Sequence, residues 1–169
     1  MNASVETARK IGPVYLFWNG ETTLDSPVKA AWPHVLNYPS WQNYSTVQTI
    51  SGKPGQEGEV VVLRKDEMGI QFPPYCARTI LLQPEHRVVW KTWPQQRSEE
   101  LDFFGIVEFR LYAADSDKTR FVYNTVYEFM VPYRQESELQ TFREQQYQNF
   151  ELLFSSILPK LKALTGSKL

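Results

Sequence analysis

The sequence predicts one α+β domain in which a curved antiparallel sheet wraps around a single long C-terminal helix. Two observations predict it: strand-like segments follow one another with only short turns between them, and the final segment changes to a helical repeat. Such a sheet needs one face covered, and only the final helix is long enough to cover it. A chain of 169 residues suits one domain. We expect that domain to span residues 1–169, with residues 1–10 flexible.

The first part of the chain is expected to form one strand followed by two short helices. Residues 13–24 are rich in β-branched and aromatic side chains, which favour a strand. The run Asp-Ser-Pro at residues 25–27 is typical of a helix start, because Asp or Ser can cap the first turn and proline needs no donor there. Pro33 removes a backbone hydrogen bond inside the next apolar stretch and predicts a kink or break. Residues 41–44 are expected to add a short turn.

Six more strands are expected between turns rich in Gly, Pro and charged residues, at residues 47–51, 59–65, 75–83, 87–93, 102–113 and 119–131. A break is expected at residues 69–74, which end in two prolines. Because side chains of a strand alternate between its faces, Phe109 and Glu108 are expected on opposite faces of the sheet.

The C-terminal segment is expected to be one amphipathic helix packed on the concave face of the sheet. From Glu136 onward, apolar residues recur at helical spacing with polar residues between them. We expect a helix over residues 137–158. Pro159 is expected to interrupt it, with a kink or restart near residues 155–156.

The charge balance and the apolar runs exclude several classes of partner and location. Lys plus Arg number 18 and Asp plus Glu number 19, so the basic excess that nucleic-acid binding needs is missing. No apolar run approaches the roughly 20 residues of a membrane-spanning helix. The single cysteine, Cys76, rules out an intrachain disulfide and fits a reducing compartment. We therefore expect a cytoplasmic protein, monomeric or homodimeric, without a nucleic-acid partner or a transmembrane segment.

The sequence also lacks motifs for catalysis, metal binding and nucleotide cofactors. His34 and His86 are the only histidines, and neither has a carboxylate or cysteine at ligand spacing. There is no phosphate-binding loop, dinucleotide fingerprint or nucleophile elbow. We therefore expect no metal and no cofactor, and we assign no catalytic residue.

Three short motifs, together with the order of the elements, carry a resemblance to a known superfamily. They are Gly58 before a strand, the turn Asp117-Lys118-Thr119-Arg120, and a helical pattern made of Ser26-Pro27, Ala31-Trp32, Val35-Leu36, Tyr38 and Trp41. The chain resembles the START-like, or helix-grip, superfamily, also called the polyketide cyclase and lipid-transport (SRPBCC-type) superfamily. Lys118 stands where the turn of that superfamily commonly has Gly.

The resemblance implies a helix-grip fold, with seven strands curved around a long C-terminal helix and two short helices after strand one. It also implies a hydrophobic ligand, because members bind lipids, sterols, plant hormones or polyketides, and a few are cyclases or hydrolases.

A cavity is expected between the sheet and the C-terminal helix, because one helix cannot fill a wide concave face. Aromatic residues make up 14% of the chain, and small residues such as Ala77 and Gly105 on the concave face would leave room. Strand alternation and helical spacing place eight of ten candidate ligand-binding residues around it, and Trp41 and Tyr44, just after the helical pair, are expected at its mouth. The ten residues are Trp41, Tyr44, Tyr75, Trp90, Val107, Phe109, Tyr123, Tyr127, Gln146 and Phe150.

Polar side chains among the aromatics of the later strands allow two interpretations. They form either a solvent-facing ladder of cross-strand pairs or a polar anchor inside the cavity, and alternation favours the ladder. These residues are Arg78, Glu108, Arg110, Asn124 and Glu128.

Three functions remain open from the sequence. The favoured one is a non-catalytic carrier or sensor of a hydrophobic small molecule, lipid-like or aromatic. The alternative is an enzyme of the polyketide aromatase/cyclase or hydrolase kind that uses the same cavity, which would require titratable groups converging inside it. A protein–protein adaptor would instead show an exposed apolar patch on the outer sheet face.

Overall fold

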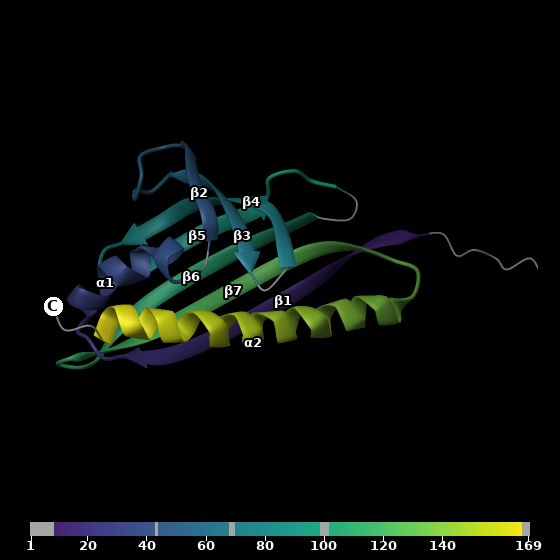
Figure 1. The fold of residues 1–169 in the computed structure, drawn as a ribbon. Helices are drawn as coiled ribbons and strands as arrows, with labels where there is room; N and C mark the ends of the chain where they lie inside the picture. Colours follow the sequence, from purple (N-terminus) through teal and green to yellow (C-terminus); the bar gives the residue numbers. More distant parts are fainter. Residues whose placement is uncertain (1–8, 43, 68–69, 99–101, 167–169) are drawn as a thin grey trace, which may run out of the picture.

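The computed structural model describes residues 9–42, 44–67, 70–98 and 102–166. Seven antiparallel strands form one curved sheet, and a long helix lies along its concave side (Figure 1). The order of strands in the sheet is β1-β7-β6-β5-β4-β3-β2. Their bounds are β1 (Lys10–Leu24), β2 (Tyr44–Ser51), β3 (Val60–Glu67), β4 (Ile70–Gln83), β5 (Arg87–Pro94), β6 (Asp102–Asp115) and β7 (Lys118–Tyr133). The predicted fold class is therefore confirmed.

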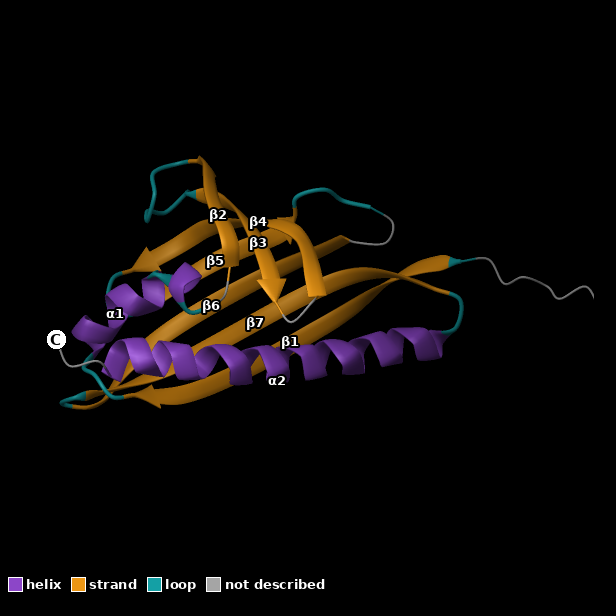
Figure 2. Cartoon of the chain, viewed as in Figure 1, coloured by secondary structure: helices purple, strands orange, loops and turns teal. Residues whose placement is uncertain are grey.

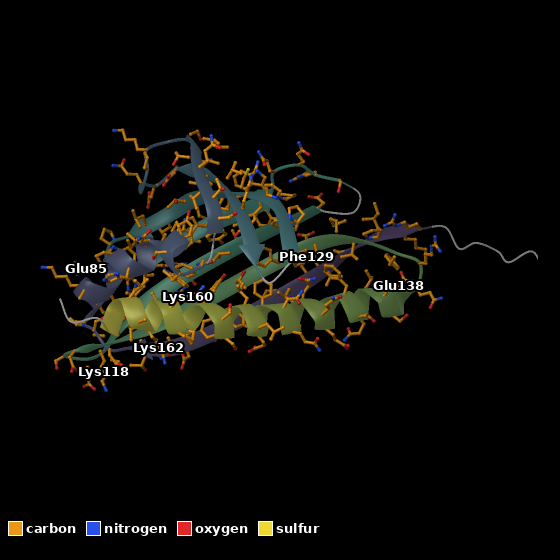
Figure 3. All side chains as sticks on the ribbon, viewed as in Figure 1. Glu85, Lys118, Phe129, Glu138, Lys160 and Lys162 are labelled. Atoms are coloured by element: carbon orange, nitrogen blue, oxygen red, sulfur yellow. The ribbon has the colours of Figure 1, made fainter. Side chains whose placement is uncertain are left out.

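The long helix α2 (Glu136–Gly166) is continuous, and the expected interruption at Pro159 is wrong. Ile157 and Leu161, on either side of the proline, are both fully buried in the core. Packing of that apolar face stabilises the helix more than one missing backbone bond weakens it. At the other end of α2, Glu138 accepts a hydrogen bond from the backbone N–H of Arg134 at 2.8 Å (Figure 3).

The segment after β1 forms one α-helix, α1 (Val28–Leu36), and a 3-10 turn, η1 (Tyr38–Ser40), instead of two short helices. Pro33 lies inside α1 without ending it. The N-cap is Pro27, and no side chain caps the helix. The carbonyl of the preceding residue, Ser26, is bound by the Thr119 hydroxyl at 2.7 Å, which ties the start of α1 to β7.

A break is expected at residues 69–74, but residues 70–74 belong to β4, which begins at Ile70 and contains both prolines. The prediction is therefore wrong for these five residues. The pairing of β3 with β4 shifts register between Leu63 and Lys65, opposite Tyr75 and Phe72. An irregularity of this kind accommodates residues that cannot donate to the ladder. Of residues 1–10, where flexibility is expected, residues 1–8 lie outside the described residues, and Lys10 begins β1.

The hydrophobic core lies between the concave face of the sheet and the two helices, which Figure 2 shows on the same side of it. Trp41 is buried there, and its ring packs against Phe109 and Phe121 at centroid distances of 5.4 and 5.9 Å. Near the middle of α2, Phe150 and Phe154 pack on Trp18 of β1. No helix in the described part of the chain is long and apolar enough to cross a membrane.

Candidate ligand-binding cavity

A cavity opens on the concave face of the sheet, under the segment that joins α1 to β2. It has about 350 Å³ of free space, part of it open to solvent, and the centre of a water molecule can reach about 40 Å³ of it. Its described lining comes from strands β2–β7 and from the segment around η1. The lining residues are Tyr38, Gln42, Tyr44, Leu63, Tyr75, Ala77, Trp90, Thr92, Val107, Phe109, Tyr123 and Tyr127.

Seven of the ten residues predicted from the sequence lie in this lining. They are Tyr44, Tyr75, Trp90, Val107, Phe109, Tyr123 and Tyr127. Six of them stand on the concave face at the position that strand alternation predicts. Tyr44, which is expected at the mouth from its place after the helical pair, begins β2. Their rings pack mainly edge to face, as in Trp90–Phe109 at 4.8 Å and Phe109–Tyr123 at 4.9 Å between centroids.

The other three predicted residues lie outside the described lining. Trp41 belongs to the core, where its indole N–H donates to the His34 carbonyl at 3.1 Å. Phe150 stacks on Trp18 and lies 5.5 Å from the Tyr127 ring, behind the cavity wall. Gln146 is half-buried on α2. No described residue of α2 lines the cavity, because the aromatic side chains of α2 pack on β1 and β7.

Five lining residues are absent from the prediction: Tyr38, Gln42, Leu63, Ala77 and Thr92. The last two belong to a row across the sheet in which Ala77 pairs with Thr92, Thr92 with Gly105, and Gly105 with Tyr127. Ala77 leaves room, as expected of a small residue. The space beside Gly105 is filled instead, because a Cβ there would collide with the Tyr127 ring and the Thr92 hydroxyl.

The hydroxyls at one side of the cavity form a short chain. The Tyr44 and Tyr75 hydroxyls bond to each other, and the Tyr44 hydroxyl also donates to Oε1 of Gln42 at 3.2 Å. Burial raises the pKa of the Tyr75, Tyr123 and Tyr127 phenols above their ordinary value. These groups therefore stay protonated at neutral pH and act as neutral hydrogen-bonding groups.

Thr92 is a buried residue of this lining, with 3% of its surface exposed. Its hydroxyl interacts with the Tyr127 phenol, a contact that offsets part of the rise in pKa that burial gives that phenol. Thr119 donates to the Ser26 carbonyl, and Thr125 donates to the Ile106 carbonyl at 3.3 Å. The Thr92 oxygen has almost no accessible surface, so this hydroxyl is part of the wall.

The described lining holds no carboxylate, ammonium, guanidinium or imidazole group. Its only titratable side chains are tyrosines, and burial also raises the pKa of Tyr38. Elsewhere in the described residues, no group of three or more His, Cys, Asp or Glu is placed to hold a metal ion. The polar side chains of the described lining are therefore neutral groups that can donate and accept hydrogen bonds.

The charged groups of the later strands lie on the outer face, which confirms the ladder interpretation for Glu108, Arg110 and Asn124. Glu108 pairs with Arg87 and with Arg110 Nε at 2.7 Å, and it accepts a hydrogen bond from Asn124 at 2.9 Å. Asn124 in turn accepts a hydrogen bond from Asn19 of β1. Burial raises the pKa of Glu108, but these partners outweigh burial and hold it below its ordinary value.

The same outer face exposes large apolar side chains on β1, β6 and β7. Tyr15 is 48% exposed, Phe17 63%, Phe104 38% and Val126 40%. Phe17 and Val126 are cross-strand neighbours, and the Lys91 ammonium lies 4.9 Å from the Phe104 ring centroid. This is the kind of surface that an adaptor function requires.

Comparison with known proteins identifies structures of the same fold. No protein-family model and no curated protein matches the sequence. Among solved structures, the chain is similar to the Zhui aromatase/cyclase from Streptomyces sp. R1128, at a TM-score of 0.65 and 17% identity over 90% of this chain and 94% of that one.

Two further structures are similar at 13% identity. Truncated norcoclaurine synthase from Thalictrum flavum has a TM-score of 0.65 over 95% of this chain and 99% of that one. Ara h 8.0201 has a TM-score of 0.57 over 88% of this chain and 99% of that one. At these identities the likeness shows that the chains share one fold.

Proposed function

We propose that this chain, which has the helix-grip fold of the START-like superfamily, binds a hydrophobic small molecule in the cavity on the concave face of its sheet. The observation that carries the proposal is the composition of the wall, in which seven of the twelve described lining residues are aromatic. A few polar groups converge among them. Small-molecule sites have this makeup: a mostly apolar, partly enclosed hollow with a small number of orienting polar groups.

The seven predicted residues of the lining are proposed to contact the ligand. Trp41 and Phe150 are proposed to support the wall from behind, because each packs against a ring that faces the cavity, Phe109 and Tyr127 respectively. The single cysteine, Cys76, is buried and unpaired. It supports the further proposal that the protein works in the cytoplasm.

Binding is favoured over catalysis by the titratable groups of the cavity. An aromatase/cyclase or hydrolase needs a group that exchanges a proton near neutral pH. The phenols of Tyr75, Tyr123 and Tyr127 are held protonated by burial. The enzyme alternative would therefore depend on hydrogen bonds that polarise a substrate.

A cavity-filling variant tests the proposal. Ala77 is 3% exposed and lines the cavity, so Ala77→Leu should occupy the space and weaken binding of an environment-sensitive hydrophobic dye by about tenfold or more. Ala113→Leu, at an exposed position of β6, is the matched control and should bind dye as the wild type does. Ala77→Val replaces the leucine variant if that does not fold. Equal dye affinity in folded Ala77 variants and in the control would place dye binding outside this cavity.

A further inference from the structure

We propose that the outer face of the sheet associates with the same face of a second copy of this chain, across a two-fold axis that runs along β6. The inference does not rest on the proposed function, because the cavity opens on the concave face. Three features of the outer face support it: an uncovered apolar strip, cations on one side of β6, and an anion on the other side.

The apolar strip crosses β1, β7 and β6. Both helices lie on the other side of the sheet (Figure 2), so no described element covers this face. A sheet face that meets water is normally polar, whereas here Phe17, Val126 and Ile106 are successive cross-strand neighbours in one row. Contiguous exposed apolar side chains of this kind mark an interaction surface. The strip consists of Tyr15, Phe17, Phe104, Ile106 and Val126.

The cations lie on β4 and β5, on one side of β6. Arg78 and Lys91 are exposed and stand directly opposite each other on these two strands. Like charges in such positions repel, and neither side chain takes part in an ion pair among the described residues. Lys91 is also the cross-strand neighbour of Ile106. The two cations therefore continue the row of the apolar strip on the far side of β6.

The anion lies on β7, on the other side of β6. Glu128 is half-buried, and its cross-strand neighbours are Tyr15 on β1 and Phe104 on β6. It takes part in no ion pair within the described part of the chain. A carboxylate that loses water to aromatic neighbours costs stability unless a cation or hydrogen-bond donors compensate it. A cation supplied by a partner would therefore stabilise Glu128.

A two-fold axis along β6 brings these groups together. When two such sheets stack face to face about this axis, β5 of each copy lies over β7 of the other, and β4 lies over β1. Lys91 then lies within one row of the partner's Glu128. Arg78 lies over the partner's Phe17, and a guanidinium is attracted to the face of an aromatic ring. The axis repeats each contact, as an isologous interface requires.

The charge pattern favours a second copy over an unrelated partner. The sign of the charge reverses from one side of β6 to the other, and the apolar strip lies between. A two-fold axis matches such a pattern to itself, so one chain supplies both the cations and the anion that the interface needs.

Sedimentation equilibrium of the full chain tests the proposal. The wild type should form dimers in samples of up to about 0.5 mM, which reveal a Kd as weak as about 100 µM. Phe17→Lys should weaken dimerisation at least about tenfold, because it places a cation in the strip beneath the partner's Arg78. Phe17→Ser replaces it if the lysine variant does not fold. Ile50→Lys, at a 54% exposed position of β2 on the opposite edge of the sheet, is the matched control.

Exchange of charges tests the two-fold axis. Lys91→Glu and Glu128→Lys each bring like charges together at two places in the dimer, and each should weaken dimerisation about tenfold. The double variant restores both pairs with their signs reversed. It should therefore dimerise within about threefold of the wild type, and the recovery measures the coupling of the two residues.

Each outcome decides for or against the proposal. A wild type that stays monomeric over this range leaves the strip to a different macromolecule and overturns it. A dimer that Phe17→Lys leaves intact, or that Ile50→Lys weakens equally, uses another surface. Failure of the double charge variant to recover would show that β5 does not face β7 of the partner, and the proposal would fail with it. Recovery of the double variant, with the control dimerising as the wild type does, supports the proposal.

Discussion

The two faces of strands β5–β7 carry different kinds of polar group. On the outer face, Glu108 has Arg87, Arg110 and Asn124 as partners, so its charge is matched and its lone pairs are used. On the inner face, the described polar side chains that line the cavity are uncharged. A matched cluster of charges stabilises the fold, whereas a few neutral polar groups among aromatic rings are typical of a small-molecule site.

The comparison also separates two kinds of aromatic side chain. Phe109 and Tyr123 are almost fully buried on the inner face, whereas Phe17 and Tyr15 are about half exposed on the outer face. The inner rings enclose a hollow, and the outer rings cover a surface. The inner face therefore holds the proposed small-molecule site, and the outer face exposes its apolar side chains to solvent.

The largest expected effect concerns the packing that supports the inner face. Leu161 of α2 is fully buried, and Leu161→Ala should lower the free energy of unfolding by about 2–5 kcal/mol. The same change at Leu152, which is 62% exposed on the same helix, should cost less than about 0.5 kcal/mol. Chemical denaturation measures both, and similar midpoints for the two variants would contradict the assigned face of α2.

The next effect tests the outer cluster. Glu108→Gln keeps the shape of the side chain but removes the charge that pairs with Arg87 and Arg110. It should lower the free energy of unfolding by about 1–3 kcal/mol, while dye affinity of the folded variant stays unchanged. Glu21→Gln, at an exposed position of β1, should leave stability within about 0.5 kcal/mol. Loss of dye binding in a folded Glu108→Gln variant would show that the two faces are not independent.

The pH dependence of the outer cluster follows from the lowered pKa of Glu108. A carboxyl group whose folded pKa is depressed stabilises the fold above its unfolded pKa, about 4.3, and this stabilisation is lost as the pH falls through the folded value. The stability difference between wild type and Glu108→Gln should therefore be full near pH 7 and shrink below about pH 4. Unfolding measured at both pH values checks this, and a constant difference would rule out the carboxylate as its source.

The smallest effect concerns a buried hydroxyl at the start of β7 that holds the segment before α1. Thr119→Val removes a hydroxyl that bonds the Ser26 carbonyl and should lower the free energy of unfolding by about 0.5–2 kcal/mol. Thr23→Val, at an exposed position of β1, is the matched control and should change it by less than about 0.5 kcal/mol. Thermal unfolding compares the two variants, and equal destabilisation would show that the Thr119 hydrogen bond contributes nothing to stability.

The sequence by itself determined the features that depend on a local repeat. The two-residue period of β6 places Phe109 inside and Glu108 outside, and the helical period after Glu136 identifies the buried face of α2. Both periods are short-range consequences of backbone geometry. They were sufficient for the fold class and for six of the strand residues that line the cavity, while Tyr44 was predicted from its place after the helical pair.

Only the tertiary structure decided which side chains meet across the sheet and which of them the helices reach. The row from Ala77 through Thr92 and Gly105 depends on the register in which β4, β5 and β6 pair. The pairing of β4 with β5 shifts register between Thr79 and Leu81, and the sequence does not show where such a shift occurs. Trp41 became core, and Tyr38, three residues earlier, became cavity wall, because the 3-10 turn η1 sets the direction of each ring. The helix α2 continues through Pro159 because the packing of its apolar face outweighs the tendency of proline to end a helix. The tendency of proline can be read from the sequence, whereas the packing depends on residues far apart in the chain.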